Sequence, residues 1–148
     1  MRNDSRIVYG KPAVFHDFEK AVLNAVIDRL CASDAEILRS QLQLLNHAYE
    51  EYDDASRKLT IYYFWRTFFG RNRTDFPKRW AGDTEKVLAR IDAVYGEKYR
   101  YHCEIVTVLG RMFAIELSSN ADDLRPISPH FVFSEIEVYP NGGVPRTN

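Results

Sequence analysis

Basic and aromatic residues are concentrated in the middle of the chain, where both kinds of side chain could bind a partner. Residues 57–80 contain seven basic residues and one acid, with aromatic rings between them. Arginine forks onto carboxylates or phosphates, and exposed rings stack on bases or fill a pocket in a partner protein. The candidate partner-binding residues in this stretch are Arg66, Arg71, Arg73, Phe76, Lys78, Arg79 and Trp80. We expect the arginines between Gly70 and Trp80 to point outward and form a docking surface.

The same stretch also has a purely structural interpretation. Ile61, Phe64, Trp65 and Phe68 would then belong to the core, and the arginines would only solvate a loop. The cations could equally pair with acids of the N-terminal half. Residues 1–56 carry ten acids against six basic residues, and residues 81–148 carry ten against seven. A patch with acidic flanks suits an acidic protein surface better than phosphate, which the flanks would repel.

An acidic run next to this stretch is a second candidate for partner binding. It consists of Glu50, Glu51, Asp53 and Asp54. Carboxylates beside tyrosines can imitate phosphates and bases, as on surfaces that block nucleases. Glu135 and Glu137 on a predicted strand allow the same interpretation. The structural alternative in each case is a solvated surface.

A histidine among charged residues is the third candidate site. Arg100, His102 and Glu104 share one face of a predicted strand, and Glu116 on the next strand could lie opposite. Such a histidine could act as a general base. Neither a glycine-rich loop nor a nucleophile accompanies it in the sequence, and polar sheet faces often have this composition. An enzyme centred on His102 and Glu104 is therefore the third hypothesis, and we expect no enzymatic activity.

Metal-binding and cofactor-binding motifs are absent from the sequence. There is no C-x-x-C, H-E-x-x-H or aspartate-rich calcium loop, and the other histidines are isolated in the sequence. We expect neither a metal nor a cofactor.

Length and composition predict one globular domain over residues 1–148, with loose termini at 1–12 and 141–148. The chain is 45% hydrophobic and 14% aromatic, which suffices for a core. The first dozen residues contain no apolar run typical of a secretory signal. The longest apolar run, Ile61–Trp65, is far too short to cross a bilayer. We expect a soluble, cytoplasmic protein that meets no membrane.

The periodicity of apolar residues predicts an α+β fold in which helices pack on a small C-terminal antiparallel sheet. Helical spacing indicates helices at about 13–31, 34–52 and 84–95. Residues 56–69 fit either a further helix or a strand, and the helix-end residues around them favour the helix. Alternation indicates strands at about 98–109, 111–118 and 130–139.

These features favour a small protein-interaction module. Within that class we expect an immunity or inhibitor protein that binds and occludes a bacterial toxin or enzyme, with electrostatic steering of the encounter. The alternative is a nucleic-acid-binding protein that uses the basic and aromatic segment 66–80.

Overall fold

The structure, a computed structural model, describes residues 7–11, 14–122, 124 and 131–146. Two helices come first, α1 (Asp17–Arg29) and α2 (Ala32–Leu44). The strands are β1 (His47–Asp53), β2 (Lys58–Arg66), β3 (Asn72–Arg73), β4 (Lys86–Tyr95), β5 (Tyr99–Val108), β6 (Arg111–Ser119), β7 (Val132–Val138) and β8 (Val144–Pro145). The class is α+β, as the sequence predicts. The arrangement is different, because strands begin at residue 47 and outweigh the helices.

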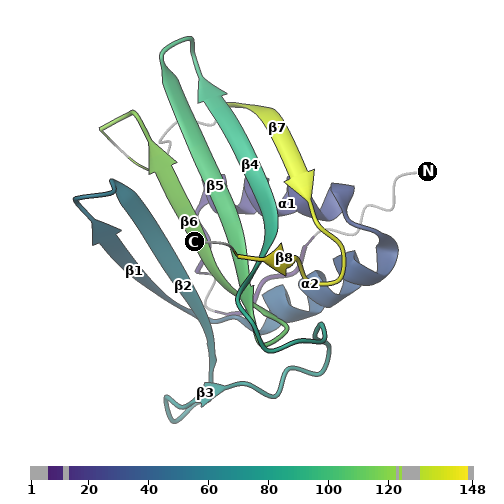
Figure 1. Cartoon of the computed structure of the whole chain (residues 1–148). Helices are drawn as coiled ribbons and strands as arrows, with labels where there is room; N and C mark the ends of the chain where they lie inside the picture. Colours follow the sequence, from purple (N-terminus) through teal and green to yellow (C-terminus); the bar gives the residue numbers. More distant parts are fainter. Residues whose placement is uncertain (1–6, 12–13, 123, 125–130, 147–148) are drawn as a thin grey trace.

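One antiparallel sheet contains all these strands, in the order β1-β2-β6-β5-β4-β7 (Figure 1). The short strands β3 and β8 pair with β2 and β4 beside this path. The predicted small C-terminal sheet carrying four helices is therefore wrong. Directly opposite residues of antiparallel strands share a face, so the register of each pair decides which side chains meet.

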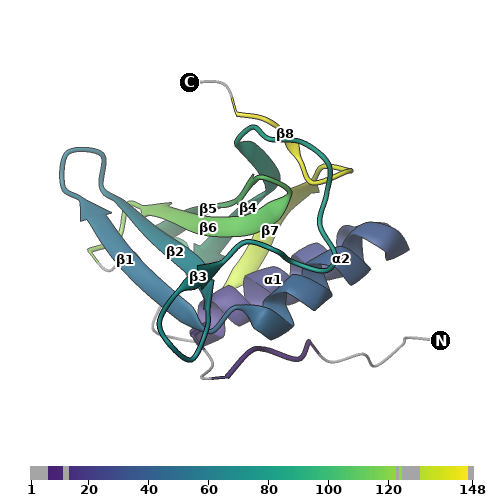
Figure 2. The ribbon, with the colours of Figure 1, turned by 90° about the horizontal axis from the view of Figure 1, so that it is seen from below.

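Both helices cover the same face of the sheet, and the core lies between the two layers (Figure 2). Val22 and Val26 of α1 and Leu38 and Leu42 of α2 are completely buried. The sheet meets them with apolar side chains that recur at every second position, as the pleat requires. These include Ile61, Tyr63, Ile91, Cys103, Ile105, Ile115 and Leu117. No helix of the described residues lies over the opposite face of the sheet.

The helix predicted over 34–52 is wrong beyond residue 44. The backbone of Leu45 is extended and leads into β1. Leu38, Leu42 and Leu45 recur at helical spacing and are fully buried, but Tyr49 and Tyr52, which continue that spacing, are exposed on a strand. The tyrosines continue the helical spacing by coincidence, and this makes the predicted helix too long, because α2 ends at Leu44.

A strand also replaces the helix favoured over 56–69, since Lys58–Arg66 form β2. Its β-branched and aromatic side chains pack well on a pleated surface, and this outweighs the helix-end residues around it. The helix predicted over 84–95 is likewise a strand, β4. Val87, Leu88 and Ala89 are all buried there, and three consecutive buried positions obscure a period of two.

The remaining predictions fare better. The first helix is shorter than the predicted 13–31, because it begins at Asp17 and ends at Arg29. The three C-terminal strands predicted at 98–109, 111–118 and 130–139 are confirmed as β5, β6 and β7. Of the termini predicted to be loose, 1–6, 12 and 147–148 lie outside the described residues. Residues 144–145 pair with β4 as β8. Neither of the described helices has the length and apolarity to cross a membrane.

Candidate functional site

Two rows of polar side chains cross the whole sheet on the face that the helices leave uncovered. From β1 to β7, the first row is Glu51, Thr60, Glu116, Glu104, Arg90 and Glu137. The second row, two residues along each strand, is Asp53, Lys58, Ser118, His102, Asp92 and Glu135. We call these twelve residues the outer face. Seven of them are carboxylates and two, Lys58 and Arg90, are cations. The register thus gathers acids from five strands on one surface.

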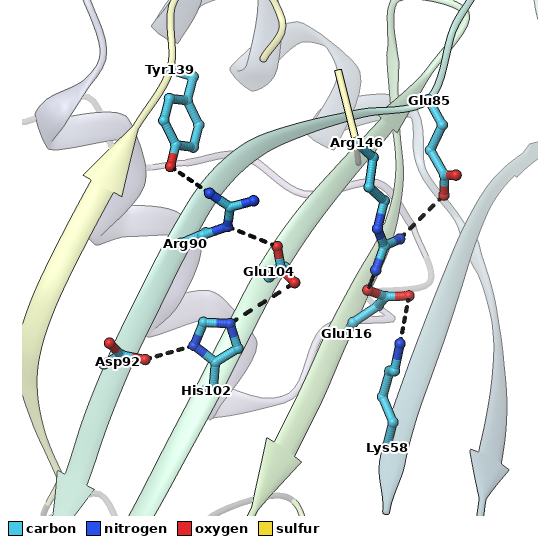
Figure 3. A network of polar contacts seen from close by, with 9 residues as sticks. All are labelled: Lys58, Glu85, Arg90, Asp92, His102, Glu104, Glu116, Tyr139 and Arg146. Atoms are coloured by element: carbon cyan, nitrogen blue, oxygen red, sulfur yellow. Dashed lines mark hydrogen bonds and ion pairs between the residues drawn. The ribbon is translucent and has the colours of Figure 1, made fainter. Parts of the chain in front are cut away.

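The cations of the outer face lie over its central strands (Figure 3). Arg90 Nε donates to Glu104 Oε2 at 3.1 Å, and Arg90 Nη1 donates to the Tyr139 hydroxyl at 2.9 Å. Lys58 Nζ lies 3.6 Å from Glu116 Oε1. The hydrogen bond to Glu104 raises the pKa of Arg90 and so favours the charged guanidinium.

Arg146 reaches the same network from the segment after β8. Its guanidinium contacts the carboxylates of Glu116 and Glu85, the latter at 3.2 Å (Figure 3). Burial disfavours the charged guanidinium, but the hydrogen bond to Glu116 outweighs it and the pKa of Arg146 is raised. Glu116 therefore faces two cations, and the C-terminal segment is tied to the centre of the sheet.

The acids at the two edges of the outer face are the exposed ones. Glu51 and Asp53 lie on β1, and Glu135 and Glu137 lie on β7. A hydrogen bond from the Ser56 side chain, and another from the Ala55 amide, lower the pKa of Asp53. Since the cations stand over the central strands, the excess negative charge lies along both edges.

His102 lies in an open groove of about 620 Å³ on this face. Its Nδ1 is 2.6 Å from Asp92 Oδ1, and its Nε2 is 3.9 Å from Glu104 Oε1. Ser118 is directly opposite His102 on β6, and Arg100 also lines the groove. Glu116 is opposite Glu104, as the sequence suggested. A carboxylate on Nδ1 orients an imidazole so that Nε2 can take a proton, so the arrangement is chemically suited to a general base.

The second half of the basic and aromatic stretch is held against α2. Phe76 and Trp80 are buried, with 4% and 6% of their surfaces exposed. Trp80 Nε1 donates to Asp34 Oδ1 at 3.0 Å. Burial opposes ionisation of Asp34, but hydrogen bonds from Cys31, Trp80 and the Asn141 amide lower its pKa. Both rings predicted to meet a partner are thus part of this protein's own core.

A buried glutamine on α2 fixes the backbone of the same loop. The Gln41 side-chain nitrogen donates to the carbonyl oxygens of Lys78 and Gly110, both at 3.0 Å. Its Oε1 accepts from the Met112 amide at 2.7 Å. The amide of Trp80 donates to Gly110 O at 2.9 Å. One amide side chain therefore joins the loop, the β5–β6 turn and the helix.

Several of the predicted docking cations have partners within the chain. Arg73 forks onto Asp75 at 3.0 and 2.6 Å, and a hydrogen bond from Arg73 lowers the pKa of that carboxyl. Lys78 pairs with Glu36, which lowers the pKa of Glu36 in the same way. Arg66 Nε donates to the neutral Asn72 Oδ1 at 3.0 Å. Arg71 and Arg79 are exposed on the surface. The expectation of outward-pointing arginines thus fits only part of the segment.

The most exposed rings of this stretch lie in the loop that joins β2 to β3. Phe68 and Phe69 at its tip are 98% and 88% exposed. The sequence predicts Phe76 and Trp80 at the surface and, in the structural alternative, Phe68 in the core. The structure reverses these positions.

The acidic run is divided between two faces of β1. Glu51 and Asp53 belong to the outer face, while Glu50 lies opposite Ile61 on the helix side and its carboxylate is 3.9 Å from His16. Asp54 lies in the β1–β2 turn. Whether these residues bind a partner stays a prediction.

Residues on β4 were missed as members of the site. Arg90 and Asp92 were assigned to a helix, so their position beside Glu104 and His102 could not be inferred. The signal that could have found them is the alternation of Arg90 and Asp92 with Ala89, Ile91 and Ala93. The contribution of Arg146 depends on how the C-terminal segment folds back, which no local pattern indicates.

Within the described ranges, His, Cys, Asp and Glu form no cluster of three or more that could hold a metal ion. Comparisons with known proteins give no name to this arrangement. No family model matches the chain, and neither the curated proteins nor the solved structures contain a match.

Proposed function

We propose that the chain is a protein-interaction module that acts as an inhibitor, of the kind that gives immunity to a bacterial toxin. Its outer face binds a basic surface on the toxin or enzyme and covers it. The observation that supports this proposal is the pair of cross-strand rows with seven carboxylates and two cations.

The position of the negative charge favours a wide basic partner. The exposed acids lie on β1 and β7, the two edge strands of the main sheet path, so negative charge borders the outer face on both sides. Opposite charges steer encounter and speed association, and the effect weakens as salt is added. A basic surface that normally holds phosphates would recognise such a row of carboxylates.

Charge reversal at one edge tests the proposal. The variant E135K/E137K changes two exposed residues of β7 without removing a core side chain. The matched control, D28K/E97K, makes the same change of net charge on α1 and on the β4–β5 turn. Each protein is used to capture the products of neighbouring genes, and affinity is measured at low and high salt.

The wild type and the control should bind one basic partner with equal affinity, and E135K/E137K should bind it at least about tenfold more weakly. Equal binding by all three proteins would show that the outer face is not the contact. Repeated failure of the wild type to retain any partner would reject the interaction module itself.

The nucleic-acid alternative keeps Phe68 and Phe69 as exposed rings but loses the two rings nearer the end of its segment. Phe76 and Trp80 are buried and cannot stack on bases, and the outer face would repel phosphate. A gel shift at low salt tests this alternative, and no binding would reject it.

A second candidate function, an enzyme that uses His102 as general base, is favoured by one specific contact. His102 Nδ1 lies 2.6 Å from Asp92 Oδ1, and the groove beside it has room for a small polar substrate. Ser118 on the neighbouring strand is the candidate nucleophile or substrate-orienting hydroxyl.

His102→Ala separates the two functions. If the enzyme hypothesis is correct, hydrolysis of a panel of small esters and phosphoesters by the wild type should fall at least about a hundredfold in this variant. Partner capture by the same variant should be unchanged, because His102 is one residue in a wide surface. An unchanged rate of hydrolysis in the His102→Ala protein would reject the enzyme hypothesis.

A further inference from the structure

Two adjacent phenylalanines are left in water at the end of the sheet. Phe68 and Phe69 are almost fully exposed, and their ring centroids lie 5.6 Å apart. They occupy the turn between β2 and β3, which projects from the lower end of the sheet in Figure 1. Leu109, which is 48% exposed, lies in the β5–β6 turn at the same end, because the end of β2 runs beside the start of β6.

Hydrogen bonds hold this turn in a defined shape. The Thr67 amide donates to Arg71 O at 2.8 Å, and the Gly70 amide donates to Thr67 O at 2.9 Å. The Arg71 amide donates to Thr67 Oγ1 at 3.2 Å. Gly70 has φ +81°, a conformation that a residue with a side chain rarely adopts. The two rings are therefore presented by a turn that its own hydrogen bonds close.

Cationic residues flank the two rings along the chain. Arg66 and Arg73 lie on the two strands that lead into and out of the turn, and Arg71 follows the tip. Arg73 is shared with Asp75 and stacks on Trp65, with its guanidinium carbon 4.1 Å from the ring centroid. Arg66 donates to a neutral amide, so its charge is not neutralised by that contact.

We propose that this end of the molecule binds the surface of an anionic lipid bilayer, with Phe68 and Phe69 inserted at the boundary of the acyl chains. The order of groups along the tip matches the order of layers in a membrane. Rings come first, where the acyl chains begin, and guanidinium groups follow at the depth of the phosphates, which they bind as forks. A bilayer deforms around a narrow convex tip, whereas a protein partner would need a preformed pocket for both rings.

The β1–β2 turn, at one end of the acidic edge strand, is held away from this contact. The β1–β2 turn, which carries Asp54, lies at the opposite end of β2 from Phe68. Nine residues of strand separate them, about 30 Å at the usual rise. This is almost four Debye lengths at physiological salt, about 8 Å each, so the Asp54 carboxylate repels the membrane little. Such a peripheral contact requires no membrane-spanning segment, and it does not depend on what the outer face binds.

Co-sedimentation with vesicles tests the proposal on the full chain. The vesicles are phosphatidylcholine alone and phosphatidylcholine mixed with phosphatidylglycerol. The wild type should bind the anionic vesicles, and binding should weaken with added salt. F68S/F69S should bind at least about tenfold more weakly, since full burial of one phenylalanine is worth more than a factor of ten. R71E should also bind more weakly, through loss of a cation.

Y49S/Y52S is the matched control, since it removes two exposed rings from β1 and should leave vesicle binding unchanged. Melting curves should show that all variants remain folded, because these rings lie outside the core. The proposal is wrong if the wild type does not sediment with anionic vesicles. That result is expected if the two rings instead fill a pocket in a protein partner. Equal binding by F68S/F69S, or equal affinity for neutral vesicles, would also overturn it.

Discussion

The basic segment and the outer face differ in how the fold treats their charges. The cations of residues 66–80 are neighbours in sequence, but the fold separates them. Some pair with acids, and the rings between them enter the core beside α2. The acids of the outer face are scattered from Glu51 to Glu137, yet strand register gathers them in two rows. Clustering in sequence is therefore a poor guide to clustering in space when the residues belong to a sheet.

The largest expected effect on stability concerns Trp80, because its ring is buried in the core beside α2 although it belongs to the basic segment. Trp80→Ala removes a buried ring and should lower the free energy of unfolding by about 3–5 kcal/mol. Trp80→Phe keeps most of the ring but loses the hydrogen bond to Asp34, and should cost about 1 kcal/mol. Urea unfolding measures both. A Trp80→Ala protein as stable as the wild type would mean that the segment is not anchored on α2.

The anchor on α2 should depend on pH through Asp34. Asp34→Ala leaves Trp80 Nε1 and the Asn141 amide without their acceptor and should cost about 2 kcal/mol at neutral pH. Since the pKa of Asp34 is lower in the folded protein than its ordinary 3.8, the carboxylate stabilises the fold fully above that value and loses this contribution as the pH falls below it. The stability difference between wild type and variant should therefore shrink in acid. A difference that stays constant down to low pH would contradict this assignment.

A smaller effect is expected at the centre of the outer face. Glu116→Gln removes a carboxylate that faces both Lys58 and Arg146, and should cost about 1 kcal/mol in urea unfolding. Because the interaction is electrostatic, the difference from the wild type should decrease in high salt. Glu135→Gln, at the exposed edge, serves as the control and should leave stability unchanged. A cost at Glu116 that is insensitive to salt would indicate a packing role instead.

The smallest effect should come from the ion pair of the basic segment. Arg73→Ala breaks an exposed ion pair with Asp75. Such pairs add little to stability, because the loss of side-chain entropy offsets the attraction between the charges. The melting temperature should not change within error. A clear loss would show that the stacking of Arg73 on Trp65 contributes to the fold, which would sharpen the contrast with Trp80.

Sequence patterns predict the parts of this fold where one period dominates. The strand at 98–109 is confirmed because apolar and polar residues alternate from Tyr99 to Ile105, and the strand at 111–118 follows it across the turn at Gly110. β4 was mistaken for a helix because both of its faces are buried around Leu88. The same error limits the prediction of the site. Alternation places His102 and Glu104 on one face of a strand, but it cannot place their partners Asp92 and Arg90 while β4 is taken for a helix. Pairing between strands is decided by register, and a single strand carries little information about its register.

The amide of Gln41 has a consequence for motion. It holds carbonyl groups of the loop and of the β5–β6 turn, together with the Met112 amide, so none of these can detach without exposing polar groups of the others. The protons on the backbone nitrogens of Trp80 and Met112 should then exchange with deuterium at one common rate, as a cooperative unit. Opening of that unit would free the loop and the hairpin at the same moment.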